Sequence, residues 1–265
     1  MAKDNAIKLN LPSADDLFST QESRDDAQRE KVMDIPLTEI EDFPNHPFKV
    51  RMDEAMLETA ESVKKYGVLV PAIVRPKDGR YQMIAGHRRK AASELAEIGT
   101  IPCIVRNYTD DEATIIMVDS NLQRETILPS EKAFAYKMKL DAMNRQGQRT
   151  DLTSTPLVSK LRTNEQVGLQ NGDSREQVRR YIRLTDLIPG ILQMVDDKKI
   201  AFRPAVEISF LSQEQQQSLF DTMECEDCTP SLAQAIKMKQ FSQDGRLGAL
   251  LLTSLPISQP KQKKS

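Results

Sequence analysis

The chain has 265 residues, of which 39% are hydrophobic and 29% are charged, the balance of a globular protein with one or two domains. Its longest apolar run, Val68–Val74, is far shorter than the roughly 20 residues that a membrane span needs. The first residues lack the apolar block of a secretory signal, and three cysteines are too few for a disulfide framework. We therefore expect a cytoplasmic protein without a membrane partner.

The formal net charge of −2 excludes a histone-like protein, but it conceals an uneven distribution. Residues 131–200 hold 13 Lys and Arg against 9 Asp and Glu, whereas the remainder has an excess of acidic residues. A modestly basic segment inside an acidic chain is a candidate contact surface for a polyanion. The 13 aromatic residues and the lack of Trp disfavour a stacking platform for single-stranded nucleic acid, so duplex DNA is the better candidate.

The pattern predicts an α+β fold of two structured parts between polar ends. Residues 1–31 are polar and charged, which predicts a disordered tail; the alternative is a short partner-binding peptide. Residues 32–108 alternate strand and helix patterns and predict a small α/β domain. Residues 109–225 predict an all-helical domain, and residues 226–265 a short C-terminal segment with a disordered end that could support self-association.

Within the α/β part, strands are predicted near Ile35 and over 68–74, 80–85 and 101–106. Pro71 indicates that the second strand lies at an edge or carries a bulge. One predicted helix runs from Asp53 to Gly67 and another over 88–97. The residues expected on the buried face of the first helix are Met56, Leu57, Ala60 and Val63.

Helices then begin at Asp110 and at Pro129, the second running through Met143. Residues 145–156 are polar and predict a loop. Two shorter helices are predicted at 163–170 and 175–184, and further helices follow to about residue 217.

The junction Gly86–Lys90 places three cations at the start of a helix. The positive end of the helix dipole disfavours Arg88, Arg89 and Lys90 there unless an anion is bound, and free N–H groups beside a glycine can hold phosphates. The alternative is that these cations pair with acidic neighbours such as Glu94. Composition alone does not separate the two.

A second polar cluster, Asp119–Glu125, ends the helix that begins at Asp110. Asn121, Arg124 and Glu125 share one helix face and could hold a divalent ion or a nucleotide. Ordinary surface polarity is the simpler interpretation of this cluster alone.

Residues 163–184 are typical of two helices around a glycine-containing turn, a helix-turn-helix. Ser174 and Gln177 fit a capping box at the second helix. Val178, Ile182 and Leu184 are expected to face inward. The candidate DNA-contacting residues are Ser174, Arg175, Gln177, Arg179, Arg180 and Arg183, because exposed arginines can bind phosphates and guanine edges in a major groove. The alternative is a solvated basic face.

These elements resemble, in order, the ParB family of plasmid and chromosome partition proteins. The segments that carry the resemblance are 45–51 (NHPFKVR), 60–71 (AESVKKYGVLVP), 84–92 (IAGHRRKAA), 121–125 (NLQRE), 128–133 (LPSEKA) and the helix-turn-helix. The similarity covers roughly residues 32–217.

The resemblance implies a clamp that binds a centromere-like DNA site, takes up CTP with Mg²⁺ in its N-terminal domain and moves with a ParA-type ATPase that acts on the N-terminal tail. A homodimer on nucleoid or plasmid DNA is implied as well. Carried over by motif, Asn121 holds the metal, and the nucleotide contacts are Arg51, Gly67, Val68, Pro71, Gly86, His87, Arg88, Arg89, Asn121 and Arg124.

The sequence departs from the family pattern at three of these positions. His87 stands where Glu is common in the arginine motif, Ser120 where a Glu implicated in hydrolysis usually precedes Asn121, and Val70 where Gln often precedes Pro71. A hydroxyl cannot replace a carboxylate as a base or as an anionic metal ligand. Nucleotide binding is therefore expected, while hydrolysis stays open, with a weak CTPase as one alternative.

Three other functions compete with partition. A nucleoid-occlusion-like factor or transcriptional regulator of a mobile element could use the same DNA-binding clamp. A sulfiredoxin-like enzyme would need a cysteine beside the His-Arg pair, where Ala85 and Gly86 stand. A zinc site at Cys225 and Cys228 would supply only two ligands, so a pair of free thiols is the simpler interpretation.

Overall fold

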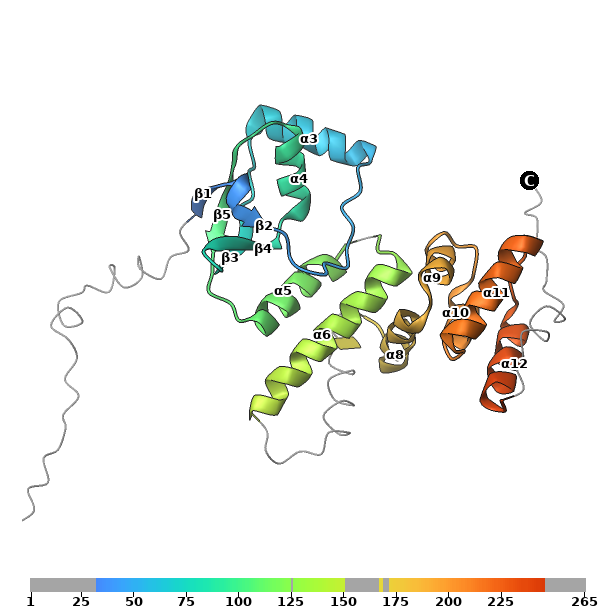
Figure 1. The fold of residues 1–265 in the computed structure, drawn as a ribbon. Coiled ribbons are helices and arrows are strands. Elements are labelled where there is room, and N and C mark those ends of the chain that lie inside the picture. Colours follow the sequence, from blue (N-terminus) through green and yellow to red (C-terminus); the bar gives the residue numbers. More distant parts are fainter. Residues whose placement is uncertain (1–31, 125, 151–166, 169–171, 246–265) are drawn as a thin grey trace, which may run out of the picture.

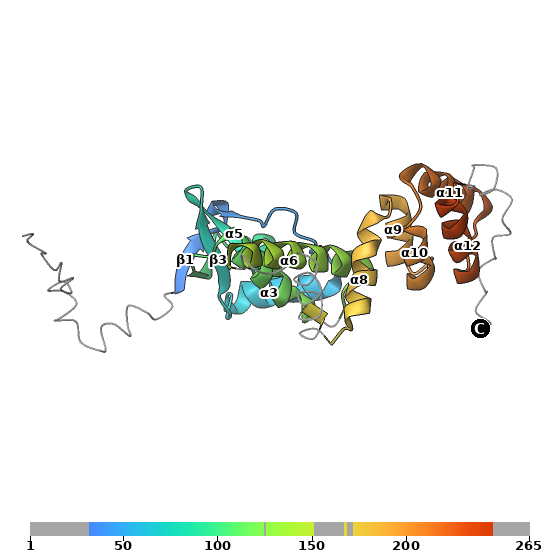
Figure 2. The same cartoon turned by 90° about the horizontal axis from the view of Figure 1, so that it is seen from below.

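The computed structural model describes residues 32–124, 126–150, 167–168 and 172–245. A mixed sheet with two covering helices forms one end of an elongated molecule, and a series of helices leads away from it to the other end (Figures 1 and 2). The predicted α+β class is confirmed. The predicted N-terminal tail, most of the 163–170 helix and the extreme C-terminus lie outside the described residues.

Five strands form the sheet, in the order β1-β5-β3-β4-β2. The β1–β5 and β3–β4 pairs are antiparallel, whereas β3–β5 and β2–β4 are parallel. Asp78 and Gly79 close the β3–β4 hairpin with positive φ at both residues, as a tight hairpin turn requires. The strands are β1 Val32–Pro36, β2 Ile40–Glu41, β3 Ala72–Lys77, β4 Arg80–Ala85 and β5 Thr100–Val105, with a 3₁₀ turn at Leu37–Glu39.

Helices α3 (Glu54–Tyr66) and α4 (His87–Leu95) lie together on one side of the sheet (Figure 1). The Asp53 carboxylate caps α3 by accepting the Met56 N–H, and Gly67 ends the helix with φ 72°. The predicted inner face is correct for Met56, Ala60 and Val63. It is wrong for Leu57, which is 59% exposed because only Met56, Ala60 and Val63 of α3 pack in the hydrophobic cluster shared with α4.

The segment before β3 differs from the prediction of one strand over 68–74, because β3 begins at Ala72. Pro71 has no N–H to donate to a strand ladder. The carbonyls of Val70 and Pro71 are instead bound by the Arg89 guanidinium of α4, at 2.8 and 2.5 Å. Residues 68–71 are therefore a loop fastened to α4.

The helical part begins with α5 (Asp110–Leu122) and α6 (Pro129–Thr150), which pack side by side under the sheet (Figure 1). The loop predicted from residue 145 is wrong as far as Thr150, because α6 continues there and Arg145 pairs with Asp111 of α5 at 2.7 Å. The following helices are α8 Arg175–Arg183, α9 Pro189–Asp196, α10 Phe202–Ile208, α11 Gln213–Glu226 and α12 Leu232–Gln243, with a 3₁₀ turn at Leu184–Asp186.

Three of the hydrophobic clusters explain how these parts are joined. One lies within the sheet, another joins α9 to α12 with Ala133 of α6, and a third crosses between the sheet part and the helices. This crossing cluster contains Phe43, Phe48, Ile84, Ala113, Met117, Val118 and Ala135. The sheet part and the α5–α6 pair thus share one core.

Gly86, between β4 and α4, should be sensitive to substitution because a positive φ and a close contact coincide there. It has φ 119°, and a Cβ there would lie 2.8 Å from the buried Ala72 Cβ. We expect Gly86→Ala to lower the free energy of unfolding by about 3 kcal/mol, measured by urea denaturation. Gly79→Ala, which has positive φ but open space around it, should cost only about 1 kcal/mol, and an equal loss in both variants would contradict the packing argument.

Candidate functional sites

The first candidate site is the junction where β4 ends and α4 begins. Gly86 is the N-cap of α4, has positive φ, and no side chain caps the first turn of this helix. The first N–H groups of α4 are therefore available, as an anion site at a helix start requires. Both the anion interpretation and the alternative of paired cations find support in the side chains around it.

The three cations of α4 have different partners. Arg88 is half-buried and lies 3.9 Å from the Asp53 carboxylate. Arg89 binds the two carbonyls of the loop before β3, and burial lowers its pKa. Lys90 is held by Asp42 at 2.8 Å. Arg88 is consequently the cation of this group with the longest and weakest pairing, and the one best able to turn toward a bound anion.

The two histidines of the chain meet beside this junction. The rings of His46 and His87 lie with centroids 4.0 Å apart, and both Nε2 atoms are buried without a hydrogen-bond partner. Burial lowers the pKa of His46. Burial also lowers the pKa of His87, to about 3, and the His46 imidazole and the cations Lys90 and Arg124 lower it further. The Asp42 carboxylate acts in the opposite direction and raises the pKa of His87. Both imidazoles are neutral at pH 7.

The end of α5 and the start of α6 form the opposite side of this site. Arg124 lies over the Phe48 ring, 5.6 Å from its centroid. Burial lowers the pKa of Arg124 and the charge of Arg88 lowers it too, whereas the Glu131 carboxylate raises it. Glu131 is buried and accepts the N–H groups of Lys49 and Leu128, at 3.0 and 3.1 Å. Asn121 is buried and donates to the Met117 carbonyl at 2.8 Å.

The structure thus brings together most of the residues predicted to bind nucleotide. The junction of β4 and α4 is surrounded by Gly86, His87, Arg88 and Arg124. Arg89 binds the Pro71 carbonyl at the end of the loop that begins with Gly67 and Val68. Arg51 is exposed, in the segment before α3. His46, Phe48 and Glu131 were not assigned to the site from the sequence; the motif segments that contain them were the only signal.

The second candidate site is the turn before α8 and the helix itself. Val167 is buried against Tyr136, and the Gly168 carbonyl accepts the Asp173 N–H at 3.0 Å. A Cβ on Gly168 would lie 2.5 Å from the Asp173 carbonyl oxygen, so this close turn requires glycine. Asp173 accepts a hydrogen bond from the Tyr136 hydroxyl and forms an ion pair with Lys132 of α6, which fastens the turn to that helix.

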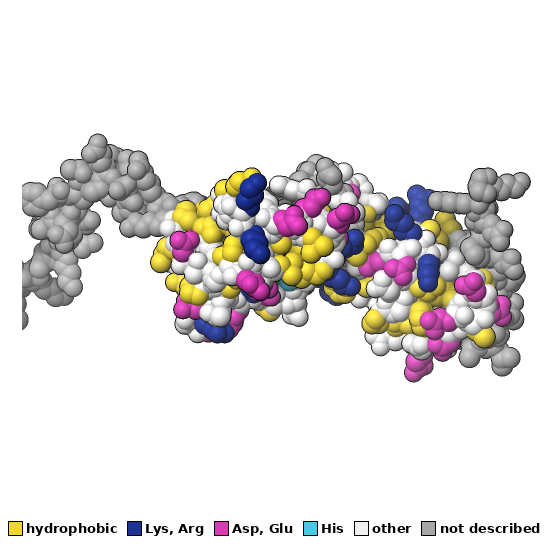
Figure 3. All heavy atoms as spheres, turned by 90° about the horizontal axis from the view of Figure 1, so that it is seen from above, with side chains coloured by type: hydrophobic (Ala, Val, Ile, Leu, Met, Phe, Trp, Pro, Cys, Tyr) yellow, Lys and Arg dark blue, Asp and Glu magenta, His cyan; other side chains and the backbone are white. Residues whose placement is uncertain are grey.

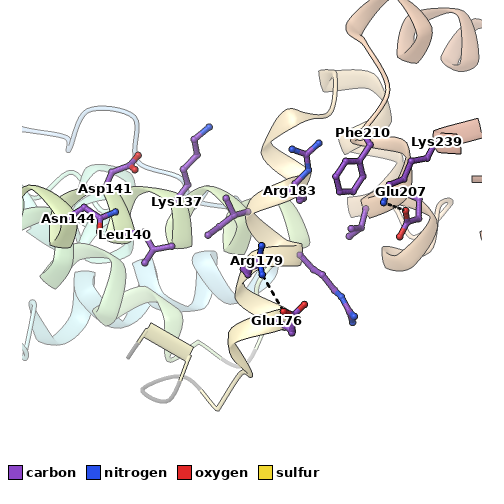
Figure 4. Close-up of a pocket in the computed structure, with 13 residues that line it drawn as sticks. Lys137, Leu140, Asp141, Asn144, Glu176, Arg179, Arg183, Glu207, Phe210 and Lys239 are labelled. Carbon is purple, nitrogen blue, oxygen red and sulfur yellow. Dashed lines mark hydrogen bonds and ion pairs between the residues drawn. The ribbon is translucent and has the colours of Figure 1, made fainter. Parts of the chain in front are cut away.

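Helix α8 presents its arginines beside a groove of about 650 Å³ between α6, α8, α10 and α12 (Figure 4). Ser174 caps α8 by accepting the Gln177 N–H at 3.2 Å, which is one half of the predicted capping box. Val178 and Leu184 are buried as predicted, and Ile182 is partly buried. Arg175 is exposed and Gln177 is partly buried.

The arginines that line the groove are not equivalent. Arg179 is exposed and pairs with Glu176 at 3.4 Å, and Arg180 is half-buried. Arg183 instead donates to the Ser209 carbonyl at 2.7 Å, pairs with Asp186 and lies 4.1 Å from the Phe210 ring centroid. Arg183, a candidate DNA contact from the sequence, thus joins α8 to the end of α10.

The zinc alternative at Cys225 and Cys228 finds no support in the described ranges. No group of three or more His, Cys, Asp or Glu that could hold a metal occurs there, and Cys228 is a buried free thiol while Cys225 is exposed. Among the helices that the structure describes, none is long and apolar enough to cross a bilayer.

A scan against known families matches residues 21–122 to the ParB N-terminal domain. The N-terminal part of the chain is a ParB N-terminal domain. Among curated ParB relatives, a nucleoid occlusion protein of Halalkalibacterium halodurans is 27% identical over 89% of this chain and 74% of its own length. The stage 0 sporulation protein J of Bacillus subtilis is 34% identical over 64% of this chain and 54% of its own length. The chain thus spans between about half and three quarters of these relatives.

Solved ParB structures are similar to the chain as well. ParB of Caulobacter crescentus in complex with the centromeric parS site is 20% identical, covers 84% of this chain and 97% of its own, and has a TM-score of 0.45. The same protein with CTP-γ-S is 24% identical, with coverage of 73% and 98% and a TM-score of 0.34.

The buried His87 predicts an acid sensitivity of the fold. Its folded-state pKa of about 3 lies below the ordinary 6.5, so between these values the unfolded chain binds a proton that the native protein does not. Its contribution to stability is complete above pH 6.5 and is lost as the pH falls toward 3. Lowering the pH from 7 to 4.5 should cost about 2.5 kcal/mol through this residue alone.

The measurement is the free energy of unfolding of wild type and His87→Gln at both pH values. Because glutamine does not titrate, the variant should lose less stability on acidification than wild type by that amount. Equal losses would contradict a buried neutral His87.

Proposed function

We propose that the protein is a sequence-specific duplex-DNA-binding partition protein whose N-terminal domain binds CTP and gates a clamp. The observation that carries the proposal is α8, a capped helix with exposed arginines, in a chain with a ParB N-terminal domain. In the solved Caulobacter complex, the ligand of that ParB is a centromeric DNA site, parS.

For the DNA contact we assign Ser174, Arg175, Gln177, Arg179 and Arg180, with Arg183 acting through the position of α8. A short helix held at its N-terminus is the usual reader of a major groove. On the face shown in Figure 3, acidic, basic and hydrophobic side chains are intermixed, so the described surface there offers no broad positive field. Binding should then depend on the few arginines of α8 more than on net charge.

For the nucleotide we assign Arg51, Gly67, Val68, Pro71, Gly86, His87, Arg88, Arg89, Asn121 and Arg124. The open N-terminus of α4 and the half-buried Arg88 fit a polyphosphate. The choice of CTP over other nucleotides rests on the similarity to the ParB family.

The described residues offer few protein ligands for Mg²⁺. Asn121 offers one neutral amide oxygen, and no carboxylate cluster lies within the described ranges. Mg²⁺ prefers carboxylate, phosphate and water oxygens in an octahedron. It would therefore need phosphate oxygens and water for most of its ligands.

Two partners follow from the family assignment: a second copy of the chain, and a ParA-type ATPase that acts on residues 1–31. A nucleoid-occlusion-like role is the second candidate, because the relative of that name aligns over more of this chain than the sporulation protein does. Both roles use the same DNA-binding helix and differ in whether cargo DNA is moved.

The DNA proposal predicts that Arg179→Ala with Arg180→Ala weakens binding to a duplex selected by the protein from a random pool. Each lost base contact should cost about 1–3 kcal/mol, and lost phosphate contacts should reduce the salt dependence of the affinity. Fluorescence anisotropy across a salt series measures both. The control is Arg80→Ala on β4, an exposed arginine paired with Glu41. Unchanged affinity in the double variant would overturn the assignment of α8.

The nucleotide proposal predicts that Arg88→Ala lowers CTP affinity by at least about tenfold, since charge-assisted contacts to phosphate contribute about 1.5–3 kcal/mol. Duplex binding without nucleotide should be unchanged. Titration calorimetry with CTP, ATP and GTP measures selectivity as well, with Arg80→Ala as the matched control. Equal CTP affinity in wild type and Arg88→Ala would place the nucleotide elsewhere.

A further inference from the structure

A pocket of about 540 Å³ lies between α9, the end of α11 and the loop that follows, and it shares no lining residue with the groove beside α8. Its apolar lining consists of Met194, Phe220, Met223 and Cys228. Met223 and Cys228 are buried, whereas Met194 and Phe220 are partly exposed. The Phe220 ring packs so closely on Gly190 that a Cβ there would lie 2.7 Å from it. Methionine and aromatic side chains adapt to apolar partners, so the pocket is suited to an apolar segment.

The rim of this pocket is acidic. It is formed by Asp197, Glu224 and Asp227, against one cation, Lys199. All four are exposed, and none of them is in an ion pair within the described part of the chain. Residues 213–228 as a whole contain five acidic residues and no basic residue. A floor that is apolar and a rim that is negative favour an occupant that is both apolar and positively charged.

Residues 246–265, which lie outside the described ranges, have this composition. They contain five Leu, one Ile, four Lys and Arg, and no acidic residue. Three of the cations follow the apolar stretch 247–257, at Lys261, Lys263 and Lys264. The groove beside α8 suits such a segment less well, because five Lys and Arg line it against three Asp and Glu.

The described chain brings this segment within reach of the pocket. Helix α12 ends at Gln243, and the Ser242 hydroxyl donates to Gln215 in the first turn of α11 at 2.7 Å. The pocket lies at the other end of α11, about 21 Å away for a helix of 14 residues. An extended chain covers that distance in about six or seven residues, so the apolar residues of 252–257 can reach the pocket and the three lysines its rim.

We propose that the apolar residues of 252–257 dock in this pocket of their own chain, with Lys261, Lys263 and Lys264 against its acidic rim. A tether of this length keeps the segment at a roughly millimolar effective concentration, which favours docking within the chain over docking on a second copy. Docked there, the three lysines are neutralised by acidic residues of the same chain and are withheld from a polyanion such as DNA. The contact does not depend on the proposed DNA and nucleotide sites.

The pocket carries its own reporters, because Met194 and Met223 line it. The full-length protein is labelled with ¹³C at the methionine methyl groups and recorded by NMR. In the variant Leu255→Ser with Ile257→Ser, both methyl signals should shift because the apolar contact is lost. The signal of Met52, which lies before α3, should stay in place and show that the fold is intact. Unchanged signals of Met194 and Met223 in this variant would overturn the proposal.

The matched control is Ser254→Ala with Ser258→Ala, which changes two residues of the same segment and keeps its apolar side chains. It should give the wild-type signals of Met194 and Met223. Shifts as large as those of the first variant would show that loss of the apolar side chains is not their cause, and would contradict docking.

The charge contact is tested by changing Lys261, Lys263 and Lys264 together. Replacing all three by Glu should move the signals of Met194 and Met223 in the same direction as the loss of the apolar side chains does. Replacing all three by Arg, which keeps the charge, should leave the signals near their wild-type positions. Equal shifts in the Glu and Arg variants would rule out a charge contact with the rim.

A mixing experiment identifies which chain supplies the segment. The labelled variant Leu255→Ser with Ile257→Ser is mixed with an excess of unlabelled wild type. Its methionine signals should keep their shifted positions, because each wild-type segment is docked on its own chain. A return of the signals to the wild-type positions would mean that a second copy fills the pocket, and would overturn docking within the chain.

Discussion

A buried lysine in the middle of α6 determines how the two halves of the molecule meet. Lys139 is 1% exposed and forms an ion pair with Asp119 of α5. An unpaired ammonium at such a position would cost several kcal/mol, so the register of α5 on α6 that brings Asp119 to Lys139 is favoured. Arg145 and Asp111 form a second pair between the same helices. The candidate sites are positioned by this helix pair.

Each site is fastened to α6 at a different point. At the N-terminus of α6, Glu131 accepts the backbone N–H of Lys49 and thereby holds the segment that carries His46. One turn further, Tyr136 donates to Asp173 in the turn before α8. Asn121, proposed above as a nucleotide contact, lies on α5 next but one to Asp119. A shift of α6 relative to α5 would therefore be felt at both sites, and this is the route by which the proposed nucleotide and DNA sites would be coupled.

The sequence was most informative where local chemistry determines the outcome. The Asp53 cap, the Gly67 end of α3, the 80–85 strand and the Ser174 cap follow from patterns of a few residues. Long-range contacts could not be predicted in the same way. Arg89 draws residues 68–71 out of the sheet, Arg145 extends α6, and Arg183 turns toward Ser209 because partners distant in the sequence are available. The His46–His87 contact and the role of Glu131 depend on such contacts as well.

The central claim is that the two sites are linked through the α5–α6 pair, and the coupling free energy between them tests it most directly. Duplex affinity is measured with and without CTP for wild type and for Lys139→Met with Asp119→Leu, which replaces the ion pair by apolar side chains of similar size. We predict that CTP changes duplex affinity several-fold in wild type, a coupling of about 1–3 kcal/mol, and less in the variant. Equal duplex affinity with and without CTP in a wild-type protein that binds both would contradict the claim.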